Sequence, residues 1–487
     1  MNMNLSQSGL SFAAAAAAFY DEMHDAGGRV RPHYEQVHRT FLEMTPSSVS
    51  RRQAAMNDRM LEEGITYTLY HPDQVDPLER TIPFDLIPRI IPNAEWRELE
   101  RGLLQRTKAL NRFLDDVYHE QNILNDGIIP RKLIVSNRYF RPEMMRLQVP
   151  NGIYATCAGI DLIRDEHGKY FVLEDNLRSP SGFSYLFTSR SIMKRLFREL
   201  YFSHPVDEVD HSLNHFLATL KSMTPSDRSN PTIALLTPGS YNSAYFEHTY
   251  LAQQMGIELV EGRDLVCMDH KIFMRTRSGQ RRIDVIYRRI DDDFLDPLAF
   301  RPDSMLGVAG VMNAYRAGNV AIANAPGTGV ADDKAIYTFV PDMIRYYLNE
   351  EPILSNVPTY LLSRPDEREY VLSRLGEMVV KETSLSGGYG MLIGPSATDE
   401  EIAAFAVKIR ENPSNYIAQP TIPLSTAPIY HDGRFVPRHI DLRAFVLSGR
   451  ETHVIPGGLT RVAMKEGSLV VNSSQGGGVK DTWVLGM

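Results

Sequence analysis

The feature that most constrains this chain is the order of two polar segments, each at the end of a strand-like apolar run. The upstream run ends in Glu174-Asp175-Asn176. The downstream run ends in Val379-Val380-Lys381, and three glycines follow it: Gly387, Gly388 and Gly390. Carboxylate and amide oxygens suit a divalent metal, whereas a lysine beside glycine-rich backbone suits phosphate oxygens. The sequence therefore predicts a metal-binding segment that precedes a phosphate-binding segment.

A β-hairpin is predicted for Ile160 to Asn176, because two apolar runs flank a turn-like sequence. If Asp165 pairs with Tyr170, Asp161 lies opposite Glu174, with their Cβ atoms about 5 Å apart. Two facing carboxylates repel each other unless a positive charge lies between them. The predicted register therefore favours a cation between Asp161 and Glu174.

The strand after this turn has a side-chain period of two residues. Asn176 then shares a face with Glu174, and Asp175 lies on the opposite face. Asp161, Glu174 and Asn176 would supply three oxygen ligands, and Mg²⁺ accepts a few such oxygens together with substrate phosphates. The alternative is an exposed hairpin end whose acidic side chains are solvated.

Lys381 and the glycines that follow it form the candidate phosphate site. A return strand is predicted at Met391-Leu392-Ile393, so Gly387, Gly388 and Gly390 lie in the turn of a hairpin. Their backbone N–H groups could approach phosphate oxygens closely. The alternative is a glycine-rich turn without a ligand. The chain has no Walker A motif, kinase glycine loop or dinucleotide-binding G-x-G-x-x-G motif, so those nucleotide sites are not supported.

Three further segments could contact a nucleotide. Lys334 follows two aspartates at a predicted helix start, although alone it could be an ordinary surface lysine. Gln419 lies in the apolar strand Tyr416 to Pro420, whose backbone could pair with an adenine edge or could form a plain edge strand. Arg443 shares a strand face with Asp441, and it could clamp a transferring phosphoryl group or form a surface salt bridge.

Other arginines lie beside loops shaped by glycine or proline. Arg178 and Arg461 are in this position. Arg288 and Arg289 close a strand of the middle region, where open sheets bind ligands, so they could anchor an anionic substrate. For each of these side chains the alternative is a solvated charge.

The chain changes character along its length. Residues 1–150 are predicted to be mainly helical and polar, with an amphipathic helix from Trp96 to Tyr118. The middle region predicts a βαβ unit and a third strand, at Thr232–Thr237, Ser243–Met255, Ile257–Val260 and Asp284–Tyr287.

Composition excludes several classes of protein. Hydrophobic residues make up 43% of the 487 residues, which is enough for two or three globular domains. The net charge of -8 disfavours a dedicated nucleic-acid binder, whose phosphate contacts need clustered Lys and Arg. The two cysteines, Cys157 and Cys267, cannot form a disulfide framework, which fits a reducing cytoplasm.

The alanine-rich segment Leu10 to Phe19 is similar to the core of a signal peptide. It lacks the preceding Lys or Arg of such a signal, so the start of a helix is predicted instead. No apolar run approaches the roughly 20 residues needed to span a bilayer. We therefore expect a cytoplasmic protein without membrane contact.

Several stretches together resemble the circularly permuted ATP-grasp proteins, whose better-known relatives include glutathionylspermidine synthetase. The stretches are Tyr20–Met23, Glu174–Gly182, Asp284–Asp293, Asp332–Lys334, Val380-Lys381, Asp441–Arg443, Pro456–Arg461 and Ser473–Gly477. In ordinary ATP-grasp enzymes the lysine strand and glycine lid precede the Glu-x-Asn metal strand. Here the two halves are swapped, and the resemblance spans residues 15–485.

The resemblance implies an α+β fold in which a permuted ATP-grasp domain is divided by an inserted α/β domain. Residues 1–150 would form a helical N-terminal region and 151–204 the metal-binding half. Residues 205–325 would form a substrate domain similar to the one that precedes ordinary ATP-grasp domains. Residues 326–487 would form the half with the lysine and the glycine lid.

The resemblance also implies roles for single residues. Lys334 and Lys381 would hold ATP phosphates, the three glycines would form a mobile lid, and Gln419 would lie at the adenine hinge. Arg443 would lie by the γ-phosphate, and the three hairpin ligands named above would bind Mg²⁺.

Catalysis and substrate binding would involve further residues. Arg178 and Arg461 are expected to take part in catalysis. Contacts to the substrate are expected from Arg288, Arg289 and Ser181.

The reaction implied is an ATP- and Mg²⁺-dependent ligation of a small-molecule or peptide carboxylate to an amine. The carboxylate attacks the γ-phosphate to give an acyl phosphate and ADP, and the amine then captures the acyl group. Bifunctional glutathionylspermidine synthetases also carry a thiol amidase domain, for which this sequence leaves no place, so their substrate pair is not carried over. Two alternatives stay open: a catalytically silent nucleotide-binding partner protein, and an ATP-dependent phosphotransferase.

Overall fold

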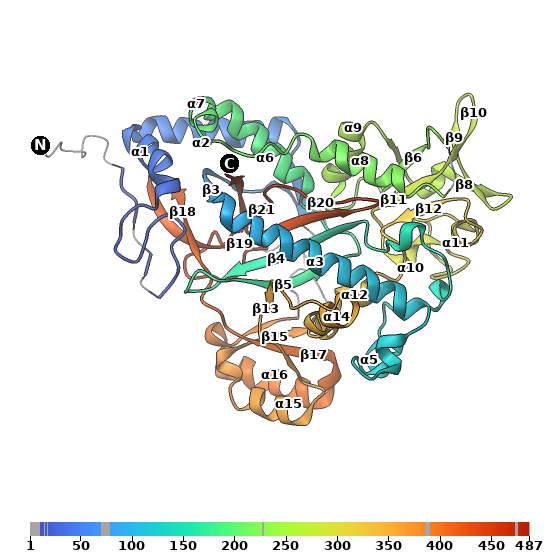
Figure 1. Ribbon diagram of the computed structural model, residues 1–487. Helices are drawn as coiled ribbons and strands as arrows, with labels where there is room; N and C mark the ends of the chain where they lie inside the picture. The colour runs from blue at the N-terminus through green and yellow to red at the C-terminus, as the bar shows by residue number, and fades with distance from the viewer. Residues whose placement is uncertain are drawn as a thin grey trace, which may run out of the picture.

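The computed structural model describes residues 10–13, 15–16, 18–69, 78–225, 228–384, 390–472 and 476–486. Within these residues, helices surround several sheets, the largest of which has nine strands (Figure 1). Its order is β13 (Ser355–Asn356), β5 (Tyr170–Asn176), β4 (Cys157–Arg164), β19 (Arg434–Ser448), β21 (Leu459–Val462), β22 (Gly478–Val484) and β3 (Phe84–Ile91), with β18 (Thr426–His431) and β20 (Thr452–Val454) also paired with β19.

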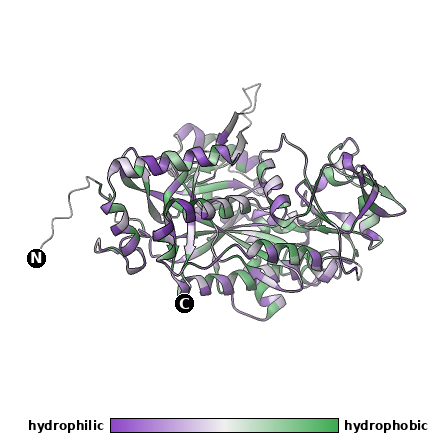
Figure 2. Ribbon diagram, turned by 90° about the horizontal axis from the view of Figure 1, so that it is seen from above, coloured by the Kyte–Doolittle hydropathy of each residue, from purple (hydrophilic) through white to green (hydrophobic). Residues whose placement is uncertain are grey.

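Helices cover both faces of this sheet, because its central strands contribute to two apolar cores. On one face, Leu442 and Val446 of β19 share a core with α3 (Asn93–Tyr118). On the other face, Phe445 shares a core with α6 (Phe183–Leu196). Figure 2 shows apolar residues gathered on the inner strands and hydrophilic residues on the outer helices. The predicted alternation along β19 is confirmed.

The middle region forms a parallel sheet in the order β12 (Ala321–Ala323), β11 (Val285–Arg288), β6 (Ile233–Leu236) and β7 (Glu258–Val260). The helix α9 (Tyr245–Met255) lies between β6 and β7 in the chain, so the predicted βαβ unit is confirmed. The predicted third strand is confirmed as β11, which pairs in parallel with β6.

A small sheet holds the lysine strand. Its order is β14 (Tyr360–Leu361), β17 (Tyr416–Pro420), β15 (Met378–Glu382) and β16 (Leu392–Ile393), and it shares an apolar core with α15 (Pro365–Leu372) and α16 (Asp399–Glu411) (Figure 1). The predicted antiparallel return strand is confirmed by the pairing of β15 with β16. The alternative of an edge strand is wrong for β17, because β17 lies between β14 and β15.

The remaining helices and strands lie outside these three sheets, and some of the strands pair with one another in two smaller sheets. They are α1 (Glu35–Glu43), α2 (Pro46–Glu62), β1 (Thr66–Leu69), β2 (Leu78–Thr81), α4 (Asn122–Asn125), α5 (Arg131–Val135), α7 (Arg198–Phe202), α8 (Ser212–Ser222), β8 (Leu265–Met268), β9 (Lys271–Thr276), β10 (Gly279–Ile283), α10 (Asp292–Leu295), α11 (Val311–Arg316), α12 (Gly329–Asp332), α13 (Lys334–Tyr337) and α14 (Val340–Leu348). In the described part of the chain, no helix is both long and apolar enough to cross a membrane.

Two expectations for the N-terminal region need correction. The described residues of the alanine-rich segment form no helix; instead Phe12 bridges Phe435 of β19, and their rings stack with centroids 4.3 Å apart. Packing of this aromatic ring outweighs the helix propensity of the alanines. The region expected to be mainly helical also contributes β3 to the large sheet, because β3 pairs in parallel with β22.

Candidate active site

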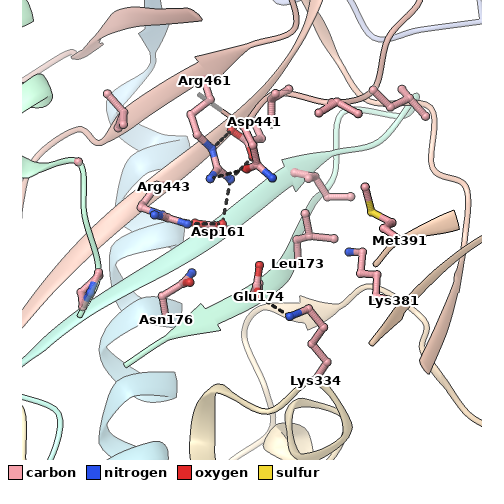
Figure 3. A pocket seen from close by; sticks show the side chains of 18 of the residues that line it. Asp161, Leu173, Glu174, Asn176, Lys334, Lys381, Met391, Asp441, Arg443 and Arg461 are labelled. Carbon is pink, nitrogen blue, oxygen red and sulfur yellow. Dashed lines mark hydrogen bonds and ion pairs between the residues drawn. The ribbon is translucent and has the colours of Figure 1, made fainter. Parts of the chain in front are cut away.

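A cavity of about 680 Å³ lies where the large sheet, the small sheet and loops of the parallel sheet meet. Strands β4, β5, β19 and β21 contribute to its lining, and so do β15, β16 and β17. Figure 3 shows the charged side chains that project into it from these strands. Segments that are far apart in the sequence therefore share one site.

The β4–β5 hairpin carries the candidate metal ligands. Asp161 lies opposite Glu174, as predicted. The turn differs from the prediction, because Tyr170 pairs with Arg164 rather than with Asp165. At a bulge between Asp161 and Leu162, β5 has one extra residue. This extra residue brings Asp161 opposite Glu174, as expected. The predicted pairing of the two carboxylates is therefore correct, although the predicted turn is wrong by one residue.

Asp175 faces away from the cavity, as the strand period predicts. Its carboxylate accepts hydrogen bonds from Nε and Nη2 of Arg106 in α3, at 2.6 Å each. Arg106 also donates from Nη1 to Oδ1 of Asn356 in β13, at 2.7 Å. This buried ion pair fixes β5 from behind, while Glu174 and Asn176 line the cavity.

Two arginines hold the aspartates of the neighbouring strands. Arg443 donates from Nε and Nη2 to Asp161, at 2.6 and 2.8 Å. Arg461 donates from Nη2 to Asp161 at 2.8 Å, and from Nε and Nη2 to Asp441, the first at 2.9 Å. Burial raises the pKa of Asp161, but the two guanidinium groups outweigh burial and lower this pKa to about 2. Asp161 is therefore ionised at neutral pH.

Two lysines stand near Glu174 (Figure 3). Lys334 is the first residue of α13, and its Nζ lies 2.9 Å from Oε1 of Glu174. The helix is capped by Asp333, one of the two aspartates expected there. Lys381, on β15, donates to Oε1 of Gln419 at 2.8 Å. Burial, supported by Lys334 and opposed by Glu174, lowers the pKa of Lys381 to about 8.

The side chain of Gln419 is engaged within the protein. Its Oε1 accepts the hydrogen bond from Lys381, and its Nε2 donates to Oγ1 of Thr359 at 3.0 Å. The segment Pro420-Thr421-Ile422, directly after it, lines the cavity. A contact of this hinge with adenine would therefore come from that segment.

One end of the cavity is apolar. Its lining comes from both sheets and the connecting loops: Ile163, Leu173, Val357, Val379, Met391, Ile393, Ile422, Leu424 and Leu469. Such a pocket suits a flat ring with few polar groups. Most of these residues were not predictable as site residues, because they lie on many segments and each is typical of an ordinary core position.

The other end of the cavity is polar. It is lined by Arg178, by the loop Ser179 to Gly182, and by Ser243. Arg178 donates from Nε to Asp332 at 2.6 Å, and its Nη1 lies 3.5 Å from Oδ1 of Asp291. Burial raises the pKa of Asp332 to about 6. Asp332 was expected only as one of two aspartates at a helix start, and its position beside Arg178 follows from tertiary structure alone.

The donor set of the hairpin fits a hard divalent cation such as Mg²⁺. Asp161 and Glu174 offer carboxylate oxygens, and Asn176 offers an amide oxygen, since its Nδ2 donates to the carbonyl of Gly159 at 3.2 Å. Among the described residues, no three His, Cys, Asp or Glu side chains are arranged to hold a metal ion by themselves. A metal at this hairpin would therefore need further ligands, which nucleotide phosphates can supply.

Arg288 and Arg289 do not line the cavity, because neighbouring loops cover the end of their strand. Arg288 is fully buried and donates from Nε to the carbonyl of Asn324 at 2.7 Å. Arg289 donates to the carbonyl of Pro180 at 2.7 Å and to Glu247 at 2.8 Å. The expectation that they anchor a substrate is therefore corrected: they brace loops behind the cavity.

The expected glycine lid is described only in part. Gly387 and Gly388 lie outside the described residues. Gly390 lies in an exposed turn with φ of 65°, a conformation that favours glycine, and Met391 after it lines the cavity. The other expected site residues converge on the cavity lining: Asp161, Glu174, Asn176, Arg178, Ser181, Lys334, Lys381, Gln419, Arg443 and Arg461.

Comparison with known proteins reveals extensive similarity. Residues 88–463 match the family described as circularly permuted ATP-grasp type 2. An uncharacterized protein of Synechocystis sp. is 52% identical over 468 residues, which cover 96% of this chain and 97% of that protein. A Frankia alni protein with the provisional name glutamate–cysteine ligase 2-3 is 41% identical over 469 residues. That match covers 96% of this chain and 54% of the Frankia protein.

A solved structure is also similar. A glutathione synthetase-like effector from Globodera pallida matches with a TM-score of 0.59, over 91% of this chain and 98% of that chain. The sequences are 12% identical, so this likeness concerns the fold alone.

Proposed function

Because the chain belongs to the circularly permuted ATP-grasp type 2 family, we propose that it is an ATP- and Mg²⁺-dependent carboxylate–amine ligase that forms an acyl phosphate. Its fold is the permuted ATP-grasp fold of the α+β class. The observation that carries the proposal is a single cavity with an apolar end, a charged middle and a polar end. This order suits adenine, the phosphates with a metal, and the substrates to be joined.

In this proposal the nucleotide spans both sheets. Adenine lies in the apolar end, and Lys334 and Lys381 bind the phosphates with their compact charges. Arg443 projects from a rigid strand and stabilises charge that develops on the transferring phosphoryl group. A divalent metal would supply positive charge that stabilises the nucleotide phosphates. Asp161, Glu174 and Asn176 would hold that metal.

The substrates would meet at the polar end, beside Arg178 and Ser181. An oxygen of the carboxylate attacks the γ-phosphorus, the bond from this phosphorus to the β–γ bridging oxygen breaks, and ADP leaves. The amine nitrogen then attacks the acyl carbon, the C–O bond to phosphate breaks, and inorganic phosphate leaves. The chain contributes position and electrostatic stabilisation to both steps.

The relatives support the bond type rather than particular substrates. The name of the Frankia protein describes a ligase that joins glutamate and cysteine. We propose the same type of bond for this chain, but not those substrates, because the match covers 54% of that protein. The substrates of glutathionylspermidine synthetase are likewise not proposed.

The proposal is tested with a screen of amino acids and short peptides that contains ATP, Mg²⁺ and hydroxylamine. A ligase should release ADP only with a carboxylate substrate, and hydroxylamine should trap the acyl phosphate as a hydroxamate. A phosphotransferase would instead yield a phosphorylated product that resists hydroxylamine, and a silent partner protein would bind ATP without turnover. Accumulation of a hydroxylamine-resistant phosphoester would contradict the ligase proposal.

A further inference from the structure

Both candidate carboxylate ligands for the metal already contact cations of the chain itself (Figure 3). Lys334 Nζ lies 2.9 Å from Oε1 of Glu174. The carboxylate of Asp161 accepts hydrogen bonds from Arg443 at 2.6 and 2.8 Å and from Arg461 at 2.8 Å. A divalent cation that approaches these carboxylates therefore meets positive charge at hydrogen-bonding distance from each of them.

Four cations of the cavity lining lie close to the candidate carboxylate ligands: Lys334, Lys381, Arg443 and Arg461. Lys381 hydrogen-bonds a neutral amide, that of Gln419, rather than a carboxylate. A metal ion alone would add to this positive charge, whereas a polyphosphate would neutralise it.

We propose that the metal site forms only when nucleotide phosphates draw Lys334 away from Glu174, so that the metal binds together with the nucleotide or after it. This inference rests on the proposed function, since it assigns an order of binding within the same site. Lys334 thereby acts as a placeholder that occupies Glu174 until phosphate arrives.

The two ion pairs differ in how easily they can separate. Arg443 and Asp161 lie on paired strands and are joined by two parallel hydrogen bonds, which makes their geometry rigid. Lys334 reaches Glu174 through a flexible four-carbon stem that ends in a point charge without a fixed fork geometry. The lysine is also the first residue of a short helix whose cap, Asp333, keeps the backbone in place while the side chain moves. Lys334 is therefore the group that can exchange partners.

The test measures Mn²⁺ binding by electron paramagnetic resonance of the free ion, with and without a non-hydrolysable ATP analogue, and subtracts the Mn²⁺ that the analogue binds in the absence of protein. The wild-type protein should bind Mn²⁺ weakly alone and stoichiometrically once the analogue is present. Lys334→Met should bind Mn²⁺ without nucleotide about tenfold or more tightly than the wild type, because Glu174 is released from a charged contact. Circular dichroism verifies that each variant is folded.

Lys381→Met is the matched control, because Lys381 has a similar position but contacts Gln419 instead of a carboxylate. Both variants should weaken binding of the analogue, but the control should not reproduce the large gain in metal affinity. A second variant, Glu174→Gln, should lose the Mn²⁺ that the protein binds beyond the amount held by the analogue alone, and it should retain metal-free binding of the analogue.

Two outcomes would overturn the proposed order of binding, and a third would overturn the proposed function. Equal Mn²⁺ affinity with and without the analogue in the wild type would overturn the proposed order. So would a Lys334→Met protein whose metal affinity without nucleotide is unchanged or no higher than that of Lys381→Met. If the analogue itself fails to bind the wild type, the proposed function falls, and this inference falls with it.

Discussion

Glu174 and Asp175 are adjacent in the sequence but have opposite surroundings. Glu174 lines the cavity beside Lys334, whereas Asp175 is buried against Arg106. We expect Glu174→Gln to abolish ADP release and to leave the free energy of unfolding nearly unchanged. Asp175→Asn should lower the free energy of unfolding by about 3–5 kcal/mol, because it leaves the charge of Arg106 buried without its partner.

Urea titrations and ADP-release assays on both variants separate the two roles. If Asp175→Asn were fully stable but inactive, Asp175 would belong to the site and the assignment of faces on β5 would be wrong.

Lys381 should contribute directly to nucleotide affinity. Lys381→Ala is expected to weaken binding of an ATP analogue by about 1.5–3 kcal/mol, the scale of a hydrogen bond to a charged group. Isothermal titration calorimetry measures this change, with Lys465→Ala as a control on an exposed lysine that does not line the cavity. Unchanged affinity in a folded Lys381→Ala protein would remove this residue from the site.

The same lysine should make nucleotide affinity depend on pH. Burial lowers the pKa of Lys381 to about 8, and phosphate binds its protonated form. As the pH rises through 8, the free protein loses this proton, so the affinity for the ATP analogue should fall between pH 7 and pH 9. Lys381→Ala should lack most of this decline in calorimetric titrations. A decline of the same size in both proteins would assign it to another group.

At the level of elements, the segment around Glu22 joins the N-terminal region to the large sheet. Its carboxylate is buried and contacts Arg89 of β3 at 2.7 Å, Arg164 of β4 at 3.0 Å and Ser425 at 2.8 Å. This explains the motif Tyr20–Met23 as a structural anchor rather than a catalytic element. The anchor holds the start of the chain against strands that lead to the cavity.

Glu22→Gln should therefore destabilise the fold by about 3–5 kcal/mol, because two buried arginines lose their shared counter-charge. The urea midpoint of unfolding measures this loss. Asp25→Asn is the matched control, since Asp25 lies on the same segment but pairs with the exposed Arg29. Equal midpoints for Glu22→Gln and the wild type would contradict a role as an anchor.

The elements that were predictable from the sequence are those with a strong local pattern. The hairpin of β4 and β5, the βαβ unit and the lysine strand follow from alternation, apolar runs and turn residues. The pairing of Asp161 with Glu174 was predicted correctly, although the bulge between Asp161 and Leu162 had no recognisable signal. The described residues of the alanine-rich start are not helical, because Phe12 packs on Phe435, which is far away in the sequence.

Site residues were predictable where a charged side chain lies on a strand of apolar or alternating residues. Arg443 and Lys381 are of this kind, and both line the cavity. Arg288 and Arg289 were misassigned, because nothing local reveals that loops cover the end of their strand. Asp332 was missed as a partner of Arg178 for the same reason.

At the scale of the whole molecule, the permuted order makes one site from distant parts of the chain. The metal hairpin and the lysine strand approach each other only in the folded state, so a nucleotide that contacts both should bind the folded protein alone. An ATP analogue with Mg²⁺ at about 100 times its dissociation constant should stabilise the fold by about 2.7 kcal/mol.

Differential scanning calorimetry should detect this effect as a rise in melting temperature. Glu174→Gln and Lys381→Ala, which lie in opposite halves of the sequence, should each reduce the rise at the same ligand concentration. If variants of only one half reduced it, the nucleotide site would not join the two halves.

Ligation through an acyl phosphate can be detected by following the oxygen atoms of the carboxylate substrate. The carboxylate substrate identified by the hydroxylamine screen is labelled with ¹⁸O in its carboxyl group and incubated with ATP, Mg²⁺ and the amine. One ¹⁸O atom from the carboxylate should appear in each inorganic phosphate released, because that oxygen bonds to the γ-phosphorus and leaves with it. Inorganic phosphate without oxygen from the carboxylate would exclude an acyl phosphate.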